Sequence, residues 1–210
     1  MIDLYTWSTP NGRKISILLE ELGIDYNVIP INIIKDEQFN ENFIKISPNN
    51  KIPAIFDHED DISLMESGAI LLFLAEKYKK FIPDNSKQRL KCIEWLNFQT
   101  CSQGPMLGQA HHFLKFNKGK SKYAETRYHN EANRLYKVIN NQLKNNKYLS
   151  GSNYTIADIA TWPWIARFEW HKINIKNYVH IVRWYTDIAS REAVQKGYDV
   201  PITGANIPIL

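Results

Sequence analysis

The segment "WSTPNGRK", Trp7–Lys14, joins a short apolar stretch to a sequence with helical periodicity. Its side chains Ser8, Thr9 and Asn11 offer hydroxyl and amide groups but no thiol. A helix that begins at Pro10 presents unpaired N–H groups and a positive dipole end at this turn. The turn is therefore suited to hold an anion, although it supplies no obvious nucleophile of its own.

A second candidate is "SPNNKIPAI", Ser47–Ile55, in which Pro53 stands at the start of a predicted strand. An Ile-Pro bond prefers the trans isomer by only about 0.5–1 kcal/mol, so both isomers are open here. A cis bond would leave the N–H and C=O of Ile52 to pair with an extended peptide. With a trans bond, Pro53 would merely be the residue at which an edge strand begins.

The third candidate is "MESGAI", Met65–Ile70, where Ser67 stands at a predicted helix start. A hydroxyl and free N–H groups at such a position hold a carboxylate well, and the neighbouring Glu66 is able to accept an ammonium group. The pair would match the carboxylate and ammonium of an amino acid. The alternative is an ordinary helix cap beside a solvated glutamate.

The cysteines and histidines give weaker signals. Cys92 and Cys101 are the only cysteines, and on one helix they would lie roughly 13 Å apart, beyond the ~7 Å that a disulfide allows. No CxxC occurs, so we expect structural thiols. His111 and His112 would point roughly 100° apart on a helix. We therefore expect no metal site there, with a proton-shuttle or cleft-lining role as the alternative.

Two regions with different patterns must position these residues. Residues 1–79 alternate strand and helix signals, with strands expected at 2–7, 25–33, 52–57 and 62–65 and helices at 10–23, 36–46 and 66–78. Residues 80–86 are polar and contain Pro83, which is typical of a linker. Residues 87–210 show only helical patterns, with helices expected from 89, over 123–144, from 155 and over 178–190. Thr155 and Asp158 are spaced as a capping box.

Composition narrows the function classes. The chain has 210 residues, of which 44% are hydrophobic and 23% charged, as in an ordinary soluble globular protein. The net charge of +4 comes with no clustered basic face, so we expect no nucleic-acid partner. Apolar runs fall short of the roughly 20 residues that span a bilayer, so we expect no membrane partner. Low cysteine usage and no evident signal peptide favour a cytoplasmic protein.

Together the three candidate stretches resemble the glutathione transferase superfamily, and most closely its bacterial nu-class disulfide-bond oxidoreductases. The resemblance is carried by "STPNG" (8–12), "ISPNNKIPAI" (46–55), "ESGAILLFLAEK" (66–77), "GPMLGQAHHF" (104–113) and "NYTIADIATWPW" (153–164). It implies an α/β thioredoxin-like N-terminal domain that binds glutathione, residues 1–79, followed by an all-α C-terminal domain, residues 87–210. It also implies a homodimer.

The resemblance implies roles for individual residues. Thr9 and Asn11 would be catalytic, because they match the residues that face the glutathione sulfur. The glutathione contacts would be Gln38 and Lys51 at the glycine end, Ile52 before a cis Pro53 at the cysteinyl unit, Glu66 and Ser67 at the γ-glutamyl group, and Arg127 from the helical domain.

The expected activity is glutathione-dependent reduction of disulfides, with transferase or peroxidase side activity. Glutathione would be the bound thiol substrate or cofactor, a small disulfide or electrophile the co-substrate, and no metal would take part. Without a CxxC, the exchanging sulfurs would belong to glutathione and the disulfide. The first alternative is a conventional transferase in which Tyr5 or Ser8 activates the thiol. The second is a glutathione-binding regulatory protein without turnover.

Overall fold

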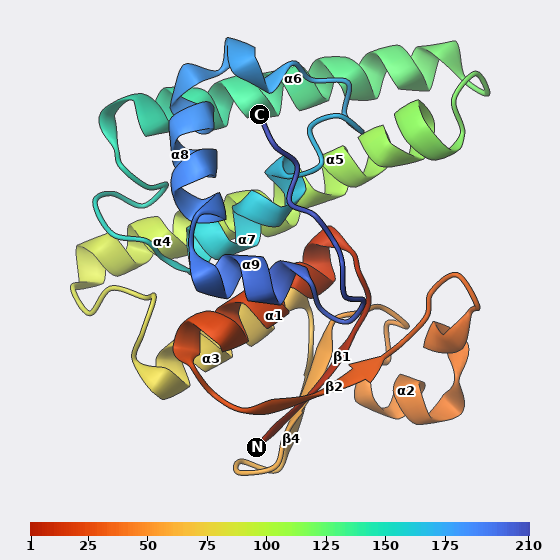
Figure 1. The fold of residues 1–210 in the computed structure, drawn as a ribbon, viewed down its shortest axis with the longest axis vertical. Helices are drawn as coiled ribbons and strands as arrows, with labels where there is room; N and C mark the ends of the chain where they lie inside the picture. Colours follow the sequence, from red (N-terminus) through yellow and green to blue (C-terminus); the bar gives the residue numbers. More distant parts are fainter. The chain divides into compact units, whose positions relative to one another are not determined.

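A computed structural model describes residues 1–210. The chain divides into two compact units. The sheet unit consists of residues 1–80 and 189–207, and the helical unit consists of residues 81–188 and 208–210. The order of a mixed sheet followed by helices (Figure 1) confirms the predicted fold class of an α/β thioredoxin-like domain followed by an all-α domain. No helix is both long enough and apolar enough to cross a bilayer.

The sheet has four strands in the order β2-β1-β3-β4. The strands are β1 (Ile2–Thr6), β2 (Tyr26–Pro30), β3 (Ala54–Asp57) and β4 (Ile62–Met65). β1 runs parallel to β2 and antiparallel to β3, and β3 and β4 are antiparallel. The parallel pair requires a crossover, which α1 (Pro10–Leu22) supplies.

Helices cover the two faces of this sheet differently. α1 packs beside α3 (Ser67–Tyr78), and both lie on the face opposite the short helix α2 (Glu41–Ile46) in Figure 1. Phe43 of α2 is buried with Ala54 and Ile31 in a small separate core. The 3-10 turn η1 (Glu37–Phe39) precedes α2.

Local sequence explains where α1 begins and ends. Thr9 caps its N-terminus in an extended conformation, and Pro10 fills the first turn, where the missing N–H costs nothing. Gly23 ends the helix with a φ of 70°, which a residue without a Cβ adopts freely. The predicted helix over 10–23 is therefore confirmed, and its start fixes the Thr9–Asn11 turn.

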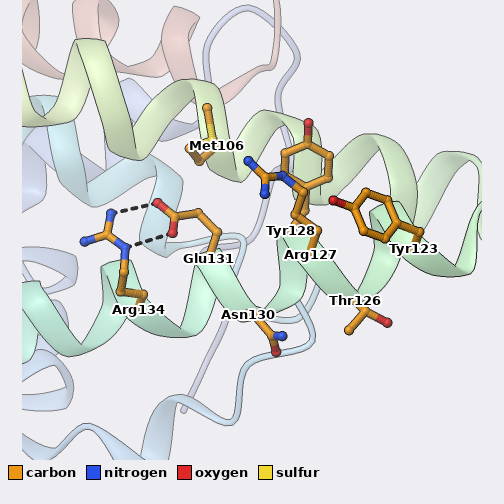
Figure 2. A pocket seen from close by; sticks show the side chains of 8 residues that line it. All are labelled: Met106, Tyr123, Thr126, Arg127, Tyr128, Asn130, Glu131 and Arg134. Carbon is orange, nitrogen blue, oxygen red and sulfur yellow. Dashed lines mark hydrogen bonds and ion pairs between the residues drawn. The ribbon is translucent and has the colours of Figure 1, made fainter.

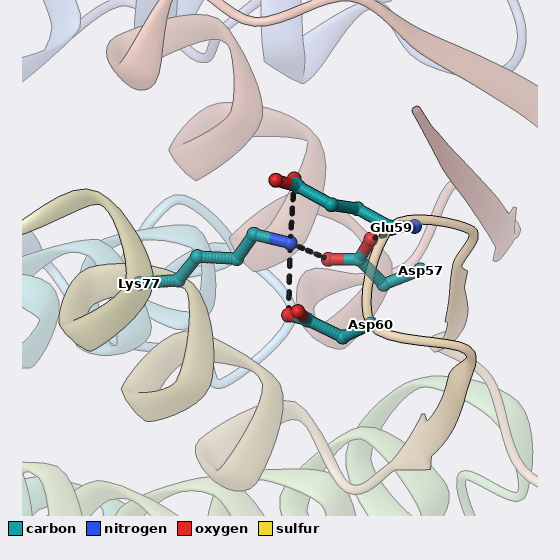
Figure 3. Close-up of polar contacts among 4 residues, drawn as sticks. All are labelled: Asp57, Glu59, Asp60 and Lys77. Carbon is teal, nitrogen blue, oxygen red and sulfur yellow. Dashed lines mark hydrogen bonds and ion pairs between the residues drawn. The ribbon is translucent and has the colours of Figure 1, made fainter.

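The loop between β3 and β4 is tied to α3 by one lysine (Figure 3). Lys77 Nζ lies 2.7 Å from Asp57, 2.9 Å from Glu59 and 2.9 Å from Asp60. Burial of Asp57 opposes its ionisation, but the Lys77 ammonium and the Glu59 N–H hold the pKa of this carboxyl below its usual value. The cluster fixes the far end of α3, whose first residue is Ser67.

A helix that the sequence patterns did not predict, α9 (Glu192–Tyr198), belongs to the sheet unit. Gly197 lies so close to α1 that a Cβ there would stand 2.5 Å from Ile17 Cα. Ser16 Oγ donates to Gly197 O at 2.6 Å, and Arg13 Nε donates to Tyr198 O at 2.9 Å. This backbone approach explains why residues 189–207, expected in the helical domain, cluster with the sheet unit.

The helical unit contains the remaining elements. They are α4 (Ser86–Phe98), the π turn η2 (Gln99–Gln103), α5 (Gly104–His111), the π turn η3 (His112–Phe116), α6 (Lys122–Asn145), α7 (Ile156–Ile165), η4 (Ile175–Asn177) and α8 (Val179–Ala189). The helix expected from residue 89 widens into a π turn before Pro105, which has no amide hydrogen to continue the ladder. The helix expected over 123–144 is confirmed as α6.

The capping box at the start of α7 is confirmed and has a wider role. Asp158 is fully buried, and its Oδ2 accepts hydrogen bonds from the backbone N–H and the hydroxyl of Thr155. Its Oδ1 accepts from Leu149 N at 2.9 Å and from Trp184 Nε1 at 2.8 Å. One carboxylate thus joins the start of α7 to α8 and to the preceding loop.

Candidate functional site

A pocket of about 160 Å³ in the sheet unit gathers the three candidate stretches. Its lining comes from the first turn of α1, the loop before β3 and the junction of β4 and α3. The lining residues are Asn11, Ser47, Asn49, Lys51, Ile52, Pro53, Met65, Glu66 and Ser67. Six of the nine residues expected to act on glutathione therefore lie around one cavity.

At the α1 side of the pocket, the turn is shaped by Thr9 and Gly12. Thr9 Oγ1 accepts a hydrogen bond from Gly12 N at 3.1 Å, which leaves the hydroxyl proton of Thr9 to donate elsewhere. A Cβ at Gly12 would collide with Trp7 O and Thr6 Oγ1, so only glycine fits this turn. Asn11, the second residue of α1, is among the residues that line the pocket.

The loop before β3 carries a cis peptide bond between Ile52 and Pro53. The isomer implied by the resemblance is therefore the one present. Ser47 Oγ donates to Lys51 O at 2.8 Å and steadies the turn that leads into the bond. None of the backbone hydrogen bonds outside helices and strands engages the N–H or C=O of Ile52. Both groups are thus available to an extended ligand.

The junction of β4 and α3 holds Glu66 in an unusual conformation. Its φ is 68° and its ψ is 111°, a region that residues with a side chain seldom occupy. Glu66 Oε1 accepts a hydrogen bond from Asn49 Nδ2 at 3.1 Å, so two walls of the pocket are joined. Ser67 follows as the first residue of α3 and also lines the pocket.

Sequence reasoning missed Lys14, which lies behind this wall. Lys14 is only 2% exposed, and its Nζ donates to Ser67 Oγ at 3.0 Å. Burial lowers the pKa of Lys14 to about 7, and the negative charge of Glu66 works against that shift. The only local signal is its place in the second turn of α1, where a lysine opposes the helix dipole.

Three of the nine expected residues, Thr9, Gln38 and Arg127, are not among the residues that line this pocket. Thr9 is the N-cap of α1, two positions before Asn11. Gln38 is on η1, and its Nε2 donates to Asp36 at 3.3 Å. Arg127 is on α6 in the helical unit, where it lines a pocket of about 620 Å³ (Figure 2). In that pocket Arg134 forms a bidentate pair with Glu131, at 2.8 and 2.7 Å, while Tyr123 and Tyr128 add aromatic walls.

The alternative thiol activators have different surroundings. Tyr5 packs against Phe43 with ring centroids 6.0 Å apart, and it does not line the pocket. Burial, followed by the charge of Asp3, raises the pKa of Tyr5, which disfavours a phenolate. Ser8 Oγ is buried without a hydrogen-bond partner.

The cysteines and histidines of the helical unit do not form a reactive group. Cys92 is buried and Cys101 is exposed, and both are free. His111 is stacked on His171 with centroids 4.6 Å apart, whereas His112 is exposed. Burial lowers the pKa of His111 to about 4, so its ring is neutral near pH 7. No group of three or more His, Cys, Asp or Glu residues is placed to hold a metal ion.

Comparison with known proteins gives relatives along nearly the whole chain. Disulfide-bond oxidoreductase YfcG of Escherichia coli K12 is 46% identical over 198 residues, which cover 92% of each chain. Disulfide-bond oxidoreductase YghU of the same organism is 37% identical, over 93% of this chain and 73% of its own length.

Solved structures show the same architecture. A glutathione transferase family member from Pseudomonas fluorescens Pf-5, with two glutathione bound, is 39% identical and covers 95% of this chain and 93% of its own, with a TM-score of 0.91. A glutathione transferase from Pseudomonas putida, with one glutathione disulfide bound per subunit, is 36% identical over 95% of this chain and 91% of its own, also with a TM-score of 0.91. The family models for the glutathione S-transferase N-terminal and C-terminal domains match residues 1–76 and 104–192, and the chain therefore belongs to the glutathione S-transferase family.

Proposed function

We propose that this chain is a glutathione-dependent disulfide-bond reductase in which glutathione supplies the reacting thiol. The observation that carries the proposal is the single pocket lined by Asn11, the cis Ile52–Pro53 segment and the Glu66–Ser67 helix start. Relatives named disulfide-bond oxidoreductases, and a relative that binds glutathione disulfide, support the same activity.

In this proposal the pocket binds glutathione as an extended peptide. Glu66 takes the ammonium and Ser67 the carboxylate of the γ-glutamyl group, because a carboxylate and a helix N-terminus suit those charges. The N–H and C=O of Ile52, before cis Pro53, pair with the cysteinyl unit. The glycine carboxylate is assigned to Lys51 and Gln38, and Arg127 of the helical domain completes the set.

Thr9 and Asn11 are the proposed catalytic residues. The Thr9 hydroxyl keeps a proton to donate because its lone pair already caps α1, and the Asn11 amide adds a second donor. The α1 N-terminus contributes about 0.3–1 kcal/mol where exposed and up to ~2 kcal/mol where partly buried. With about 1.4 kcal/mol per pKa unit, these terms lower the pKa of a thiol by roughly one to two units.

Glutathione supplies the redox chemistry. The thiols of two glutathione molecules are oxidised to one glutathione disulfide, while the substrate disulfide is reduced to two thiols. The protein's part is to hold and ionise the thiol, and no side chain changes oxidation state. Cys92 and Cys101 take no part in this scheme. A small disulfide is the proposed co-substrate, and electrophiles or peroxides would be turned over as side activities.

The deciding experiment measures disulfide reduction in a coupled assay with glutathione and a small model disulfide. Asn11→Ala should lower the rate at least about tenfold, the cost of one charge-assisted hydrogen bond to the thiolate, while glutathione binding is partly kept. Thr9→Ala should act in the same direction. Asn42→Ala, an exposed control on α2, should match the wild type. An unchanged rate in Asn11→Ala would refute the role assigned to this residue.

Two results would favour the alternatives. Activity lost only in Ser8→Ala or Tyr5→Phe, with conjugation of an electrophile as the main reaction, would indicate a conventional transferase. Calorimetric glutathione binding without any reductase or peroxidase rate would indicate a regulatory protein.

We also propose that the chain works as a homodimer in the cytoplasm. The family resemblance supports the dimer. The two free cysteines are consistent with a reducing compartment. Sedimentation of the purified protein tests the dimer, which should give about twice the 24.6 kDa of one chain.

A further inference from the structure

The contact between Lys14 and Ser67 restricts the direction in which the serine hydroxyl points. An ammonium group has three donors and no lone pair, so Lys14 Nζ donates to Ser67 Oγ across their 3.0 Å contact. The O–H bond of Ser67 must then point in another direction. Ser67 lines the pocket and Lys14 does not, so the pocket is where an acceptor for that proton would lie.

We propose that Lys14 is a positioning residue for the amino-acid carboxylate of glutathione: it turns the Ser67 hydroxyl toward the pocket and places a positive charge behind it. The inference rests on the proposed function, since it takes Ser67 as the contact to the γ-glutamyl carboxylate. Lys14 acts through Ser67 and through its charge, because it is only 2% exposed and is not among the residues that line the pocket.

Protonation of Lys14 then becomes linked to glutathione binding. A neutral amine would accept the Ser67 proton and turn the hydroxyl away from the ligand. Burial lowers the pKa of Lys14 to about 7 in the free protein, with Glu66 opposing the shift, so both forms are populated at neutral pH. A bound carboxylate favours the ammonium form, so binding takes up a proton.

The other charged groups on α1 and on the elements packed against it, α9, α3 and β1, have partners of their own. Arg13, on the same helix, lies over the Tyr198 ring of α9 at 3.6 Å. Further pairs are Arg191 with Glu21, Tyr26 with Glu20, Lys196 with Glu192, His58 with Asp3, and Lys77 with Asp57 at the far end of α3. Glu76 of α3 is also engaged in an interaction. Glu66 lines the pocket, and its negative charge acts on Lys14.

The test uses S-methylglutathione, whose blocked sulfur cannot ionise, and calorimetry between pH 5.5 and 8 in two buffers of different ionisation enthalpy. Wild-type affinity should fall as the pH rises above 7, and binding at pH 7 should take up about half a proton. Lys14→Met should bind at least about tenfold more weakly at pH 6, with no proton uptake. Lys45→Met, an exposed control, should behave as the wild type.

A second ligand separates this role from a merely structural one. An S-methylglutathione analogue with the γ-glutamyl carboxylate replaced by an amide should bind wild type and Lys14→Met equally. Weakening of both ligands alike in Lys14→Met, or wild-type affinity that is constant with pH, would overturn the inference. Absence of any S-methylglutathione binding would overturn the proposed function with it. If both ligands bind as expected but the protein does not reduce disulfides, the reductase activity is refuted and the role of Lys14 stands.

Discussion

Replacing Lys14 with methionine should stabilise the fold, and the gain should depend on pH. The pKa of Lys14 is about 7 in the folded protein, against 10.5 for an exposed lysine. The unfolded chain therefore binds more protons between these values, so wild-type stability rises as the pH increases from 7 toward 10.5. Below pH 7 the full cost of burying the ammonium is present. Methionine has a similar length and no charge, so it avoids that cost.

The magnitude follows from the same two pKa values. At about 1.4 kcal/mol per pKa unit, the burial cost is at most about 5 kcal/mol below pH 7. Loss of the hydrogen bond to Ser67 destabilises the variant by about 1–2 kcal/mol. The free energy of unfolding of Lys14→Met should therefore exceed that of the wild type by about 2–4 kcal/mol at pH 6.

Urea unfolding at pH 6, 7, 8 and 9 measures this gain directly. The free energy of unfolding of Lys14→Met should exceed that of the wild type most at pH 6, and the difference should shrink by up to about 1.4 kcal/mol per pH unit above 7. Lys45→Met, an exposed lysine on α2, should stay within about 0.5 kcal/mol of the wild type. A variant less stable than the wild type at pH 6, or a difference constant with pH, would refute the reasoning.

Two further predictions concern a buried carboxylate in the helical unit and the glycine turn at the start of α1 in the sheet unit. Asp158→Asn places an amide donor where a carboxylate oxygen now accepts two hydrogen bonds, so the helical unit should lose about 2–4 kcal/mol of stability in urea unfolding; unfolding as in the wild type would contradict the assigned role. Gly12→Ala should weaken calorimetric glutathione binding at least about tenfold, because a Cβ collides with the Trp7 carbonyl and distorts the turn. Gly23→Ala, at the other end of α1, should cost stability without changing affinity, and equal losses in both variants would count against a local effect.

Several features of the fold were predictable because local sequence decides them. Thr9, Pro10 and Gly23 mark the ends of α1 by their own backbone preferences. The Thr155–Asp158 spacing fixes a capping box in the same way. The isomer of the Ile52–Pro53 bond was open from the residues alone, since the intrinsic preference is small, and only the resemblance favoured the cis form.

Other features depend on contacts between distant segments. The docking of α9 depends on Gly197 meeting the backbone of α1 about 180 residues earlier, which no local pattern reveals. Lys14 looks like a solvated basic residue beside Arg13, yet its ammonium lies buried against Ser67. The assignment of individual residues to glutathione remains a prediction for the whole set, and Thr9, Gln38 and Arg127 do not line the pocket of the sheet unit.

The central claim is that the reacting sulfur belongs to glutathione and not to the protein, and a cysteine-free variant tests it most directly. Replacing buried Cys92 with alanine and exposed Cys101 with serine removes both thiols of the chain. The account predicts that this double variant, once shown to be folded by circular dichroism, reduces a small disulfide with glutathione at the wild-type rate. Loss of the glutathione-dependent rate in the folded double variant would contradict it.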